Sequence, residues 1–177
     1  ALVEEFIHGD ELTVGVLGTD AAARALPVLE IDFSGCAASG EYFYSWRMKE
    51  FQGDAGQGLT PAFHCPARLL PEVAARVADA ALRAHRALGC ADFSRTDIRL
   101  RDGVPYVLEV NPLPGLDPAE SNFPRMTAAI GLSYPALITS LIDGALVRAG
   151  RGTRPQEPSP YPPSTIGASG RIGSRRA

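Results

Sequence analysis

The clearest pattern in the chain is a pair of alternating runs within residues 93–111, with a short turn between them. Ile98, Leu100, Tyr106, Leu108 and Val110 share one parity, and Arg95, Asp97, Glu109 and Asn111 share the other. The turn Arg101-Asp102-Gly103-Val104 predicts a β-hairpin with a three-residue loop at 102–104. Residues of equal parity share a face of a strand, so the hairpin should have one apolar face and one polar face.

The register of this hairpin decides which polar side chains meet. With the predicted loop, Asp97 lies opposite Glu109 and Arg95 lies opposite Asn111. The same register pairs Ile98 with Leu108, and Leu100 with Tyr106. Slipping by one residue would place each carboxylate opposite an aliphatic side chain, which a buried face disfavours. Because two carboxylates directly opposite each other repel, we expect a positive charge beside them.

The rest of the pattern predicts further strands and helices up to about Gly150. Strands are expected at 1–7, 11–17 and 25–31, the first two forming a hairpin and the third beginning after Pro27. Helices are expected at 71–88, 122–130 and 134–148. The polar segment 32–66 is too long for an ordinary connection and is expected to be a functional loop with short ordered pieces. Hairpins interleaved with helices make the predicted class α+β.

The helix that begins at Pro71 and stops before Gly89 has a predicted apolar stripe. The stripe consists of Val73, Val77, Ala81, Ala84 and Leu88. The three histidines show no metal-ligand spacing. We expect His8 in a turn, His64 in a loop and His85 on the surface of this helix.

Composition divides the chain near residue 150. Residues 1–150 look globular, whereas 151–177 are rich in Pro, Gly, Ser and Arg and are expected to be a disordered tail. The net charge of −3 gives no nucleic-acid footprint, and the few arginines of the tail fit a solvated segment better than a nucleic-acid contact.

The three cysteines are an odd number with no paired spacing, which is typical of reduced thiols in a cytosolic protein. No apolar run approaches the length of a membrane span, and the first residues lack the regions of a signal peptide. The chain starts without Met and inside a strand pattern, which suggests a fragment.

The polar face of the hairpin has the chemistry of a metal site. The carboxylates of Asp97 and Glu109 and the amide oxygen of Asn111 are hard oxygen ligands, suited to Mg²⁺ held beside substrate phosphates. Arg95 could contact a phosphate oxygen from the same side. In the alternative, the two carboxylates are solvated side chains on an exposed sheet face, paired with Arg95 or Arg99. Spacing alone leaves both interpretations open.

The stretch GCADFSRTDIRLRDGVPYVLEVNPLPGL resembles the metal-binding end of the ATP-grasp superfamily. It is most similar to D-alanine–D-alanine ligases, in which R-x-D, a hairpin and E-x-N-x-x-P-G follow one another. The resemblance extends over residues 1–148 and includes VEEFIHGDELTVGVLG and FHCPARL. It implies the C-terminal lobe of an ATP-grasp fold, an antiparallel sheet with flanking helices. It also implies a cytoplasmic carboxylate–amine ligase of peptidoglycan biosynthesis that uses ATP and Mg²⁺ or Mn²⁺ and forms an acyl-phosphate.

The resemblance also implies roles for individual residues. The implied metal ligands are Asp97, Glu109 and Asn111. The implied catalytic and substrate-holding residues are Arg95, Gly115 and Ser121. The implied nucleotide contacts are Glu4, Glu5 and Ile7 at the adenine, Glu11 at the ribose and Lys49 at the phosphates. From the residues alone, Glu11 could be a surface acid and Ser121 a helix cap.

Two features depart from the ligase pattern. Glu50 follows the loop lysine where an aromatic residue or His is usual, and the segment GLDPAESNFP is one residue longer than in many D-alanine ligases. Both regions touch the acceptor, so a ligase for another amino acid or a natural-product precursor stays open. The first lobe and the first-substrate domain of the family would precede residue 1, so a truncated, non-catalytic remnant also stays open. Small-molecule substrates are the expected partners, without nucleic acid or membrane, and a homodimer is not excluded.

Overall fold

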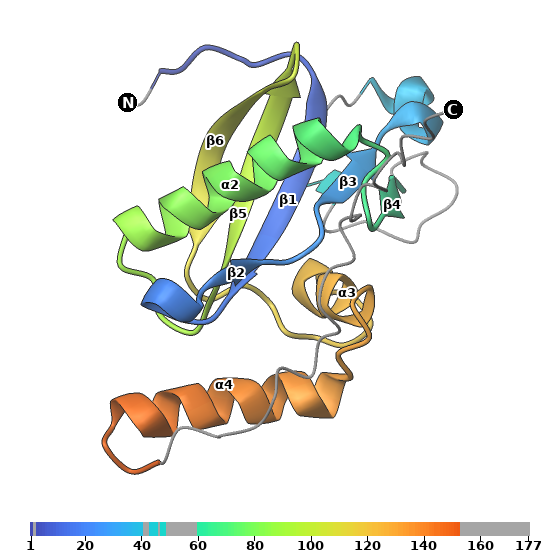
Figure 1. Cartoon of the computed structure of the whole chain (residues 1–177). Helices are drawn as coiled ribbons and strands as arrows, with labels where there is room; N and C mark the ends of the chain where they lie inside the picture. Colours follow the sequence, from blue (N-terminus) through green and yellow to red (C-terminus); the bar gives the residue numbers. More distant parts are fainter. Residues whose placement is uncertain (2, 41–42, 46, 49–59, 153–177) are drawn as a thin grey trace, which may run out of the picture.

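The centre of the molecule is an antiparallel sheet whose strands follow the order β4-β3-β1-β5-β6, with β2 paired to β1 (Figure 1). The computed structural model describes residues 1, 3–40, 43–45, 47–48 and 60–152. The strands are β1 Asp10–Leu17, β2 Arg24–Ala25, β3 Leu29–Asp32, β4 Ala62–His64, β5 Phe93–Arg101 and β6 Val104–Asn111. The helices are η1 Asp20–Ala22, η2 Ser34–Ser39, α2 Pro71–Ala87, α3 Asn122–Ala128 and α4 Tyr134–Arg148.

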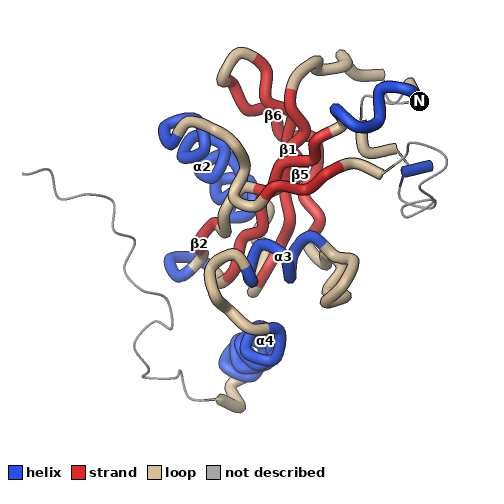
Figure 2. Tube along the Cα trace, turned by 90° about the vertical axis from the view of Figure 1, so that its right-hand side faces the viewer, coloured by secondary structure: helices blue, strands red, loops and turns tan. Residues whose placement is uncertain are grey.

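Helices cover the two faces of the sheet differently. On one face, Leu12, Val14 and Val16 of β1 pack with Val77 and Ala81 of α2 in a buried core. On the other face, a second buried cluster joins Leu17, Leu29, Ile31, Phe123, Met126 and Leu137. In both views α3 lies between the sheet and α4 (Figure 1 and Figure 2). The α3 side also carries the polar positions of β1 and β5, so the candidate site lies beside this second cluster.

The predicted strand at 1–7 is wrong. In the described part of this segment, residues 1 and 3–7, the backbone forms no strand, and the first strand begins at Asp10. The reason lies in the neighbours of β1. Along Asp10–Leu17 one edge of β1 pairs with β5, and the other edge pairs with β3 and then β2. A hairpin with the preceding segment therefore has no free edge to use.

The β5–β6 hairpin is confirmed, but its turn is shorter than predicted. Arg101 pairs with Val104, which leaves a two-residue turn, Asp102-Gly103, with φ of 53° and 73°. This is the left-handed geometry of the tight hairpin turns that Asp-Gly favours. A bulge at Asp97/Ile98 then shifts the register back, so that Asp97 still faces Glu109.

The bulge separates the confirmed cross-strand pairs from the wrong ones. Asp97 opposite Glu109 and Arg95 opposite Asn111 are confirmed, because both pairs lie beyond the bulge. The aliphatic pairs lie between the bulge and the turn, and there the prediction was wrong by one residue. Ile98 faces Val107, and Leu100 faces Pro105.

Helix α2 begins at Pro71 and is followed by Gly89 at φ 62°, as the pattern predicts. Its buried residues include Val77 and Ala81, but two expectations fail. Leu88 is 66% exposed, because the helix ends at Ala87 and position 88 no longer follows the helical period. His85 is fully buried rather than on the surface, with its Nδ1 2.7 Å from the hydroxyl of Ser94. That hydroxyl is the polar partner that lets an imidazole occupy a core position.

The remaining predicted elements correspond to observed ones. The strand at 25–31 is confirmed after Pro27, as β3, while β2 precedes the proline. Segment 32–66 contains the expected short ordered pieces, η2 and β4, so His64 lies on a strand and not in a loop. The helices at 122–130 and 134–148 appear as α3 and α4.

The free cysteines are those expected from their odd number and unpaired spacing. All three cysteines are free thiols, and burial raises the pKa of Cys65 to about 11. Across the described ranges, every helix is too short or too polar to cross a membrane. The boundary near residue 150 and the disordered tail stay predictions, since residues 153–177 lie outside the described part of the chain.

Candidate active site

Three neighbouring strands bring polar side chains to the α3 side of the sheet. The β1–β5 register places Thr13 beside Asp97 and Glu11 beside Arg99. The β5–β6 register places Asn111 beside Arg95. Residues two apart on one strand share a face, so these side chains form one continuous polar surface. The sheet thereby brings together residues that are about 80 to 90 positions apart in the sequence.

A cavity of about 340 Å³ opens over this surface. Six of the residues implied by the family resemblance line it, namely Glu11, Arg95, Asp97, Asn111, Gly115 and Ser121. The other lining residues are Leu12, Ile31, Tyr44, Glu120 and Asn122. The structure therefore brings the predicted acceptor-side residues and two of the three predicted metal ligands, Asp97 and Asn111, to one cavity, whereas Glu109 is not among its lining residues.

Arg95 and Asp97 form a two-pronged ion pair inside the cavity. Arg95 Nε and Nη2 each donate to a different oxygen of Asp97 at 2.8 Å. The hydroxyl of Thr13 donates to Asp97 Oδ1 at 2.7 Å. Burial alone would lower the pKa of Arg95, but its bonds to Asp97 and the nearby carboxylate charges outweigh burial and raise it. Arg95 is thus the positive charge that the facing carboxylates require.

Glu11 is held by a second arginine and by the main chain. Arg99 Nη2 lies 2.9 Å from Glu11 Oε2, and the N–H of Tyr44 donates to the two Glu11 oxygens at 3.1 and 3.3 Å. Arg99 also donates to the carbonyl of Gly9 at 2.8 Å and stacks over the ring of Phe6. Because Arg99 is only 4% exposed, its charge acts in a site of low dielectric.

The loop after β6 approaches Ser121 closely. A Cβ at position 115 would lie 2.7 Å from the Ser121 hydroxyl oxygen, so only glycine fits there without movement. Ser121 stands directly before α3, but its hydroxyl accepts from the N–H of Asp117 at 3.1 Å instead of capping the helix. The carboxylate of Asp117 in turn accepts the N–H groups of Ala119 and Glu120. These bonds fix the wall of the cavity.

The three implied metal ligands lie on the adjacent strands β5 and β6, but their side chains have different partners. Asp97 is bound by Arg95, whereas the Glu109 side chain is 63% exposed and lies 4.0 Å from Arg95 Nη2. Asn111 Oδ1 accepts the N–H of Leu113 at 3.2 Å. Within the described ranges, no cluster of three His, Cys, Asp or Glu side chains could hold a metal. Two carboxylates and one amide oxygen still fit Mg²⁺ if waters and phosphate oxygens supply the other ligands.

The implied adenine contacts are separate from this cavity. Glu4 and Glu5 are exposed on the N-terminal segment, and Glu5 pairs with Arg101 at 2.8 Å. Ile7 is buried. A neighbouring cavity of about 360 Å³ is lined by Phe6, His8, Gly9, Phe33 and Arg99. Lys49 and Glu50 lie outside the described residues, so their roles stay predictions.

Several residues of the site were not identified from the sequence. Thr13 and Arg99 each stand two positions from an implied site residue, so parity would have indicated them once the β1–β5 pairing was known. Such pairing between distant strands cannot be read from local patterns. Tyr44 carried no signal that distinguished it from an ordinary loop residue, whereas Glu120 and Asn122 belong to the segment GLDPAESNFP, which was singled out as a whole but not by these residues.

Comparison with known proteins agrees with this geometry. The model of a family described as D-ala D-ala ligase C-terminus matches residues 1–143. A D-alanine–D-alanine ligase of Bordetella petrii is 46% identical over 145 residues, which are 81% of this chain and 40% of that protein. One from Nitratidesulfovibrio vulgaris is 43% identical over 152 residues, 85% of this chain and 45% of that protein. The chain thus spans less than half the length of these curated relatives.

Solved structures lead to the same family. A Bacillus anthracis D-alanine–D-alanine ligase complexed with ATP has a TM-score of 0.61 and 28% identity, and the match covers 84% of this chain and 42% of that one. The VanG D-Ala:D-Ser ligase of Enterococcus faecalis has a TM-score of 0.58 and 31% identity, covering 78% and 36%. The mixed fold with its open antiparallel sheet is therefore the C-terminal lobe of an ATP-grasp ligase, as expected. The chain belongs to the D-alanine–D-alanine ligase family, of which it contains the C-terminal part.

Proposed function

We propose that this chain is the metal- and acceptor-binding part of an ATP-dependent ligase that joins two small D-amino acids through an acyl-phosphate. One observation carries the proposal. Arg95, Asp97 and Asn111 line the same cavity as Gly115 and Ser121, so charge-stabilising groups and acceptor-holding groups share one space. The use of ATP is supported by the ATP-bound relative of similar fold.

The proposed reaction has two balanced steps. The γ-phosphoryl group of ATP passes to the carboxylate of the first amino acid and leaves ADP. The amine of the second amino acid then attacks the acyl carbon, loses a proton and expels inorganic phosphate. Negative charge grows on the phosphoryl group in the first step and on the carbonyl oxygen in the second. Donors already in place lower both barriers most.

In this proposal each residue has a limited task. Bound Mg²⁺, held by Asp97, Glu109 and Asn111, would neutralise phosphate charge during the transfer. Arg95 donates to the developing oxyanion. When Arg95 leaves Asp97 to do so, the negative charge of the substrate replaces that of Asp97 beside the guanidinium. Ser121 binds the carboxylate of the acceptor, and the backbone of Gly115 allows that carboxylate to approach closely. Glu11 accepts hydrogen bonds from the ribose hydroxyls, and its carboxylate is already oriented by Arg99 and the N–H of Tyr44.

The identity of the acceptor is a second question. The D-Ala:D-Ser ligase matches this chain at 31% identity, similar to the 28% of the Bacillus anthracis enzyme, so the fold does not separate the acceptors. Glu50 in the sequence and Glu120 in the cavity wall are both acidic. These acids favour a test of several D-amino acids over an assumption of D-alanine.

The test uses a longer polypeptide that also supplies the remainder of the ligase. We expect ADP formation that depends on a D-amino acid, with the dipeptide identified by mass spectrometry. Glu109→Gln should abolish turnover because it removes one carboxylate from the metal set, whereas Arg83→Gln, a surface change on α2, should not. ATP hydrolysis that is indifferent to every amino acid tested would contradict the proposal.

A further inference from the structure

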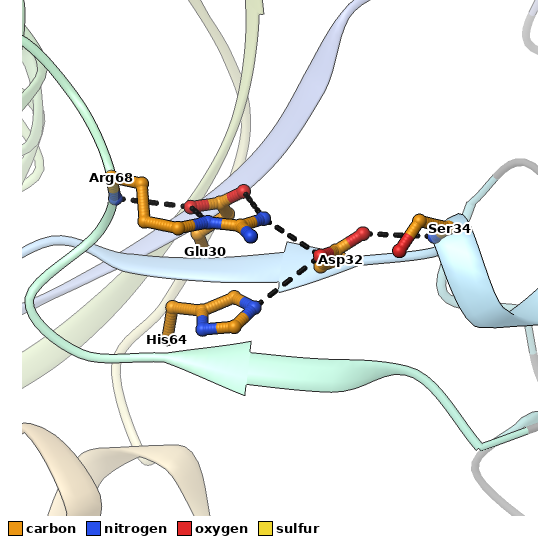
Figure 3. Close-up of polar contacts among 5 residues, drawn as sticks. All are labelled: Glu30, Asp32, Ser34, His64 and Arg68. Carbon is orange, nitrogen blue, oxygen red and sulfur yellow. Dashed lines mark hydrogen bonds and ion pairs between the residues drawn. The ribbon is translucent and has the colours of Figure 1, made fainter.

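A network of charged and hydrogen-bonded groups lies at the β3–β4 edge of the sheet, outside both cavities (Figure 3). Its members are Glu30, Asp32, Ser34, His64 and Arg68. Arg68 Nη2 lies 2.6 Å from Glu30 Oε1 and 2.7 Å from Asp32 Oδ2. The backbone N–H and the Nε of Arg68 donate to Glu30 Oε2 at 3.0 and 3.1 Å. One arginine thus joins two carboxylates of the same strand.

Asp32 is the centre of this network. Its Oδ1 accepts the N–H of Ser34 at 2.8 Å, and its Oδ2 lies 3.3 Å from His64 Nε2 and 2.7 Å from Arg68. The bond from the Ser34 backbone, followed by the Ser34 side chain and Arg68, holds the pKa of Asp32 well below its ordinary value. Asp32 ends β3 and directly precedes segment 33–61, whereas His64 and Arg68 come after it. The network therefore ties the two ends of this segment together.

Strand β4 links this network to the active-site cavity. His64 pairs with Glu30 across the ladder, and the adjacent Phe63 points to the opposite face. There the ring of Phe63 meets Tyr44 edge-on, with centroids 6.0 Å apart, and Arg125 stacks on it at 4.7 Å. Tyr44 lines the cavity, and its N–H donates to Glu11. A continuous series of contacts thus runs from Arg68 to Glu11.

We infer that Asp32 and Arg68 are positioning residues, which fix β4 at the sheet edge and so hold Phe63 and Tyr44 against the Glu11 carboxylate. An isolated surface ion pair would contribute little. Here, however, both carboxylates are only 14% exposed, and three residues, Ser34, His64 and Arg68, converge on Asp32. The importance of this positioning for catalysis rests on the proposed function, but the mechanical link itself does not.

The link can be measured in the chain itself by amide hydrogen exchange, followed by NMR. Asp32→Asn keeps an oxygen for the Ser34 N–H but removes the charge that binds Arg68. Arg68→Gln removes the other partner. In each variant we expect the Tyr44 amide and the β4 amides to exchange several-fold faster, with unchanged exchange in α2. Because Asp32 and Arg68 share one contact and each keeps others of its own, the double variant should exchange faster than either single variant but less than the two separate effects combined would give.

A matched control and two contrary outcomes complete the test. Arg83→Gln breaks an exposed arginine–aspartate pair on α2 and should leave the Tyr44 amide unaffected. Faster exchange in β4 without any change at Tyr44 would show that the network secures only the strand. Faster exchange throughout α2 as well would show a general loss of stability. Either result overturns the inference, and neither depends on whether the chain belongs to an active ligase.

Discussion

Asp97 is bound on both oxygens by protein groups, so a metal ion that uses this carboxylate competes with Arg95 for it. Glu109 differs, because it is largely exposed and only 4.0 Å from the guanidinium. Substitutions of the two carboxylates therefore test different interactions. A change at Asp97 tests the ion pair together with the metal. A change at Glu109 tests the metal with little effect on the fold.

We expect millimolar Mg²⁺ or Mn²⁺ to raise the melting temperature, because a ligand that binds only the folded state stabilises it by mass action. At 100 times the dissociation constant the gain is about 2.7 kcal/mol. Glu109→Gln should abolish the metal dependence and cost little stability without metal. Asp97→Asn should abolish it too, but should cost about 1–3 kcal/mol because Arg95 loses its charged partner. Metal-independent melting, with and without nucleotide, would contradict the metal assignment for this chain.

His85 makes stability depend on pH. Burial lowers its pKa from the ordinary 6.5, offset in part by the Gly18 backbone and by Asp20, while Arg86 adds to the lowering. The unfolded chain therefore binds more protons than the folded chain between the lowered pKa and 6.5, and stability falls as pH falls through this range. Asp32, whose pKa is lowered, changes the free energy of unfolding only at more acidic pH, below about 3.8.

The test is the urea midpoint measured from about pH 7.5 to about pH 5. His85→Asn, which can still reach the Ser94 hydroxyl, should lower stability at neutral pH because it leaves a void, but should flatten the pH dependence. His8→Asn, at an exposed position, is the control and should keep the wild-type slope. An unchanged slope in His85→Asn would assign the pH dependence to another group.

At the scale of elements, the β5–β6 hairpin depends on a turn that only a few residues can form. Gly103 has φ 73°, and a Cβ there would lie 3.1 Å from Arg76 Nη2, at the flexible end of that side chain. We expect Gly103→Ala to destabilise the chain by about 1 kcal/mol, since an L side chain is disfavoured in the left-handed region. Gly103→Asn should cost less, because Asn tolerates this region better. Equal thermal stability of wild type and Gly103→Ala would show that the turn is not strained.

This hairpin also shows what the sequence could and could not predict. Alternation located both strands, and the conflict between carboxylates and aliphatic residues selected the correct pairing of Asp97 with Glu109. The turn length was wrong by one residue, and a bulge compensated for it. A bulge arises from local packing and has no signature in alternation, so the pairs nearest the turn could not be predicted.

Other predictions failed where contacts between residues distant in the sequence determine the local structure. Residues 1–7 have a strand-like pattern, but β1 uses one edge for β5 and the other for β3 and β2, and no local signal in the sequence indicates this. His85 is polar by composition, yet it is buried in the core, where the distant Ser94 hydroxyl meets its Nδ1 while its Nε2 is without a hydrogen-bond partner among the described residues. Helices with clear end signals, such as α2 with Pro71 and Gly89, were predicted nearly to the residue. Of the site, the residues on the hairpin followed from parity, whereas Glu11, Gly115 and Ser121 needed the family resemblance.

At the scale of the whole molecule, one lobe can supply only part of a grasp-type site. The cavity beside Arg95 opens over the sheet, and the chain spans 40% and 45% of the two curated ligases described above. The described residues of this lobe offer carboxylates, two site arginines and the cavity in which we propose that the acceptor binds. Residues that would place the first substrate in line with the γ-phosphate are expected in the part that these relatives have in addition.

We therefore expect the 177-residue chain alone to bind ATP weakly or undetectably and to form no ADP with D-alanine or another amino acid. Correct placement of reactants is worth about 10⁵–10⁸ M in effective concentration, and the lobe alone cannot provide it. A longer polypeptide with the remaining ligase segments should gain turnover, and Glu109→Gln in that protein should remove it. The measurement is coupled detection of ADP with both proteins at equal concentration. Amino-acid-dependent ADP formation by residues 1–177 alone would show that this lobe holds all the groups that the chemistry requires.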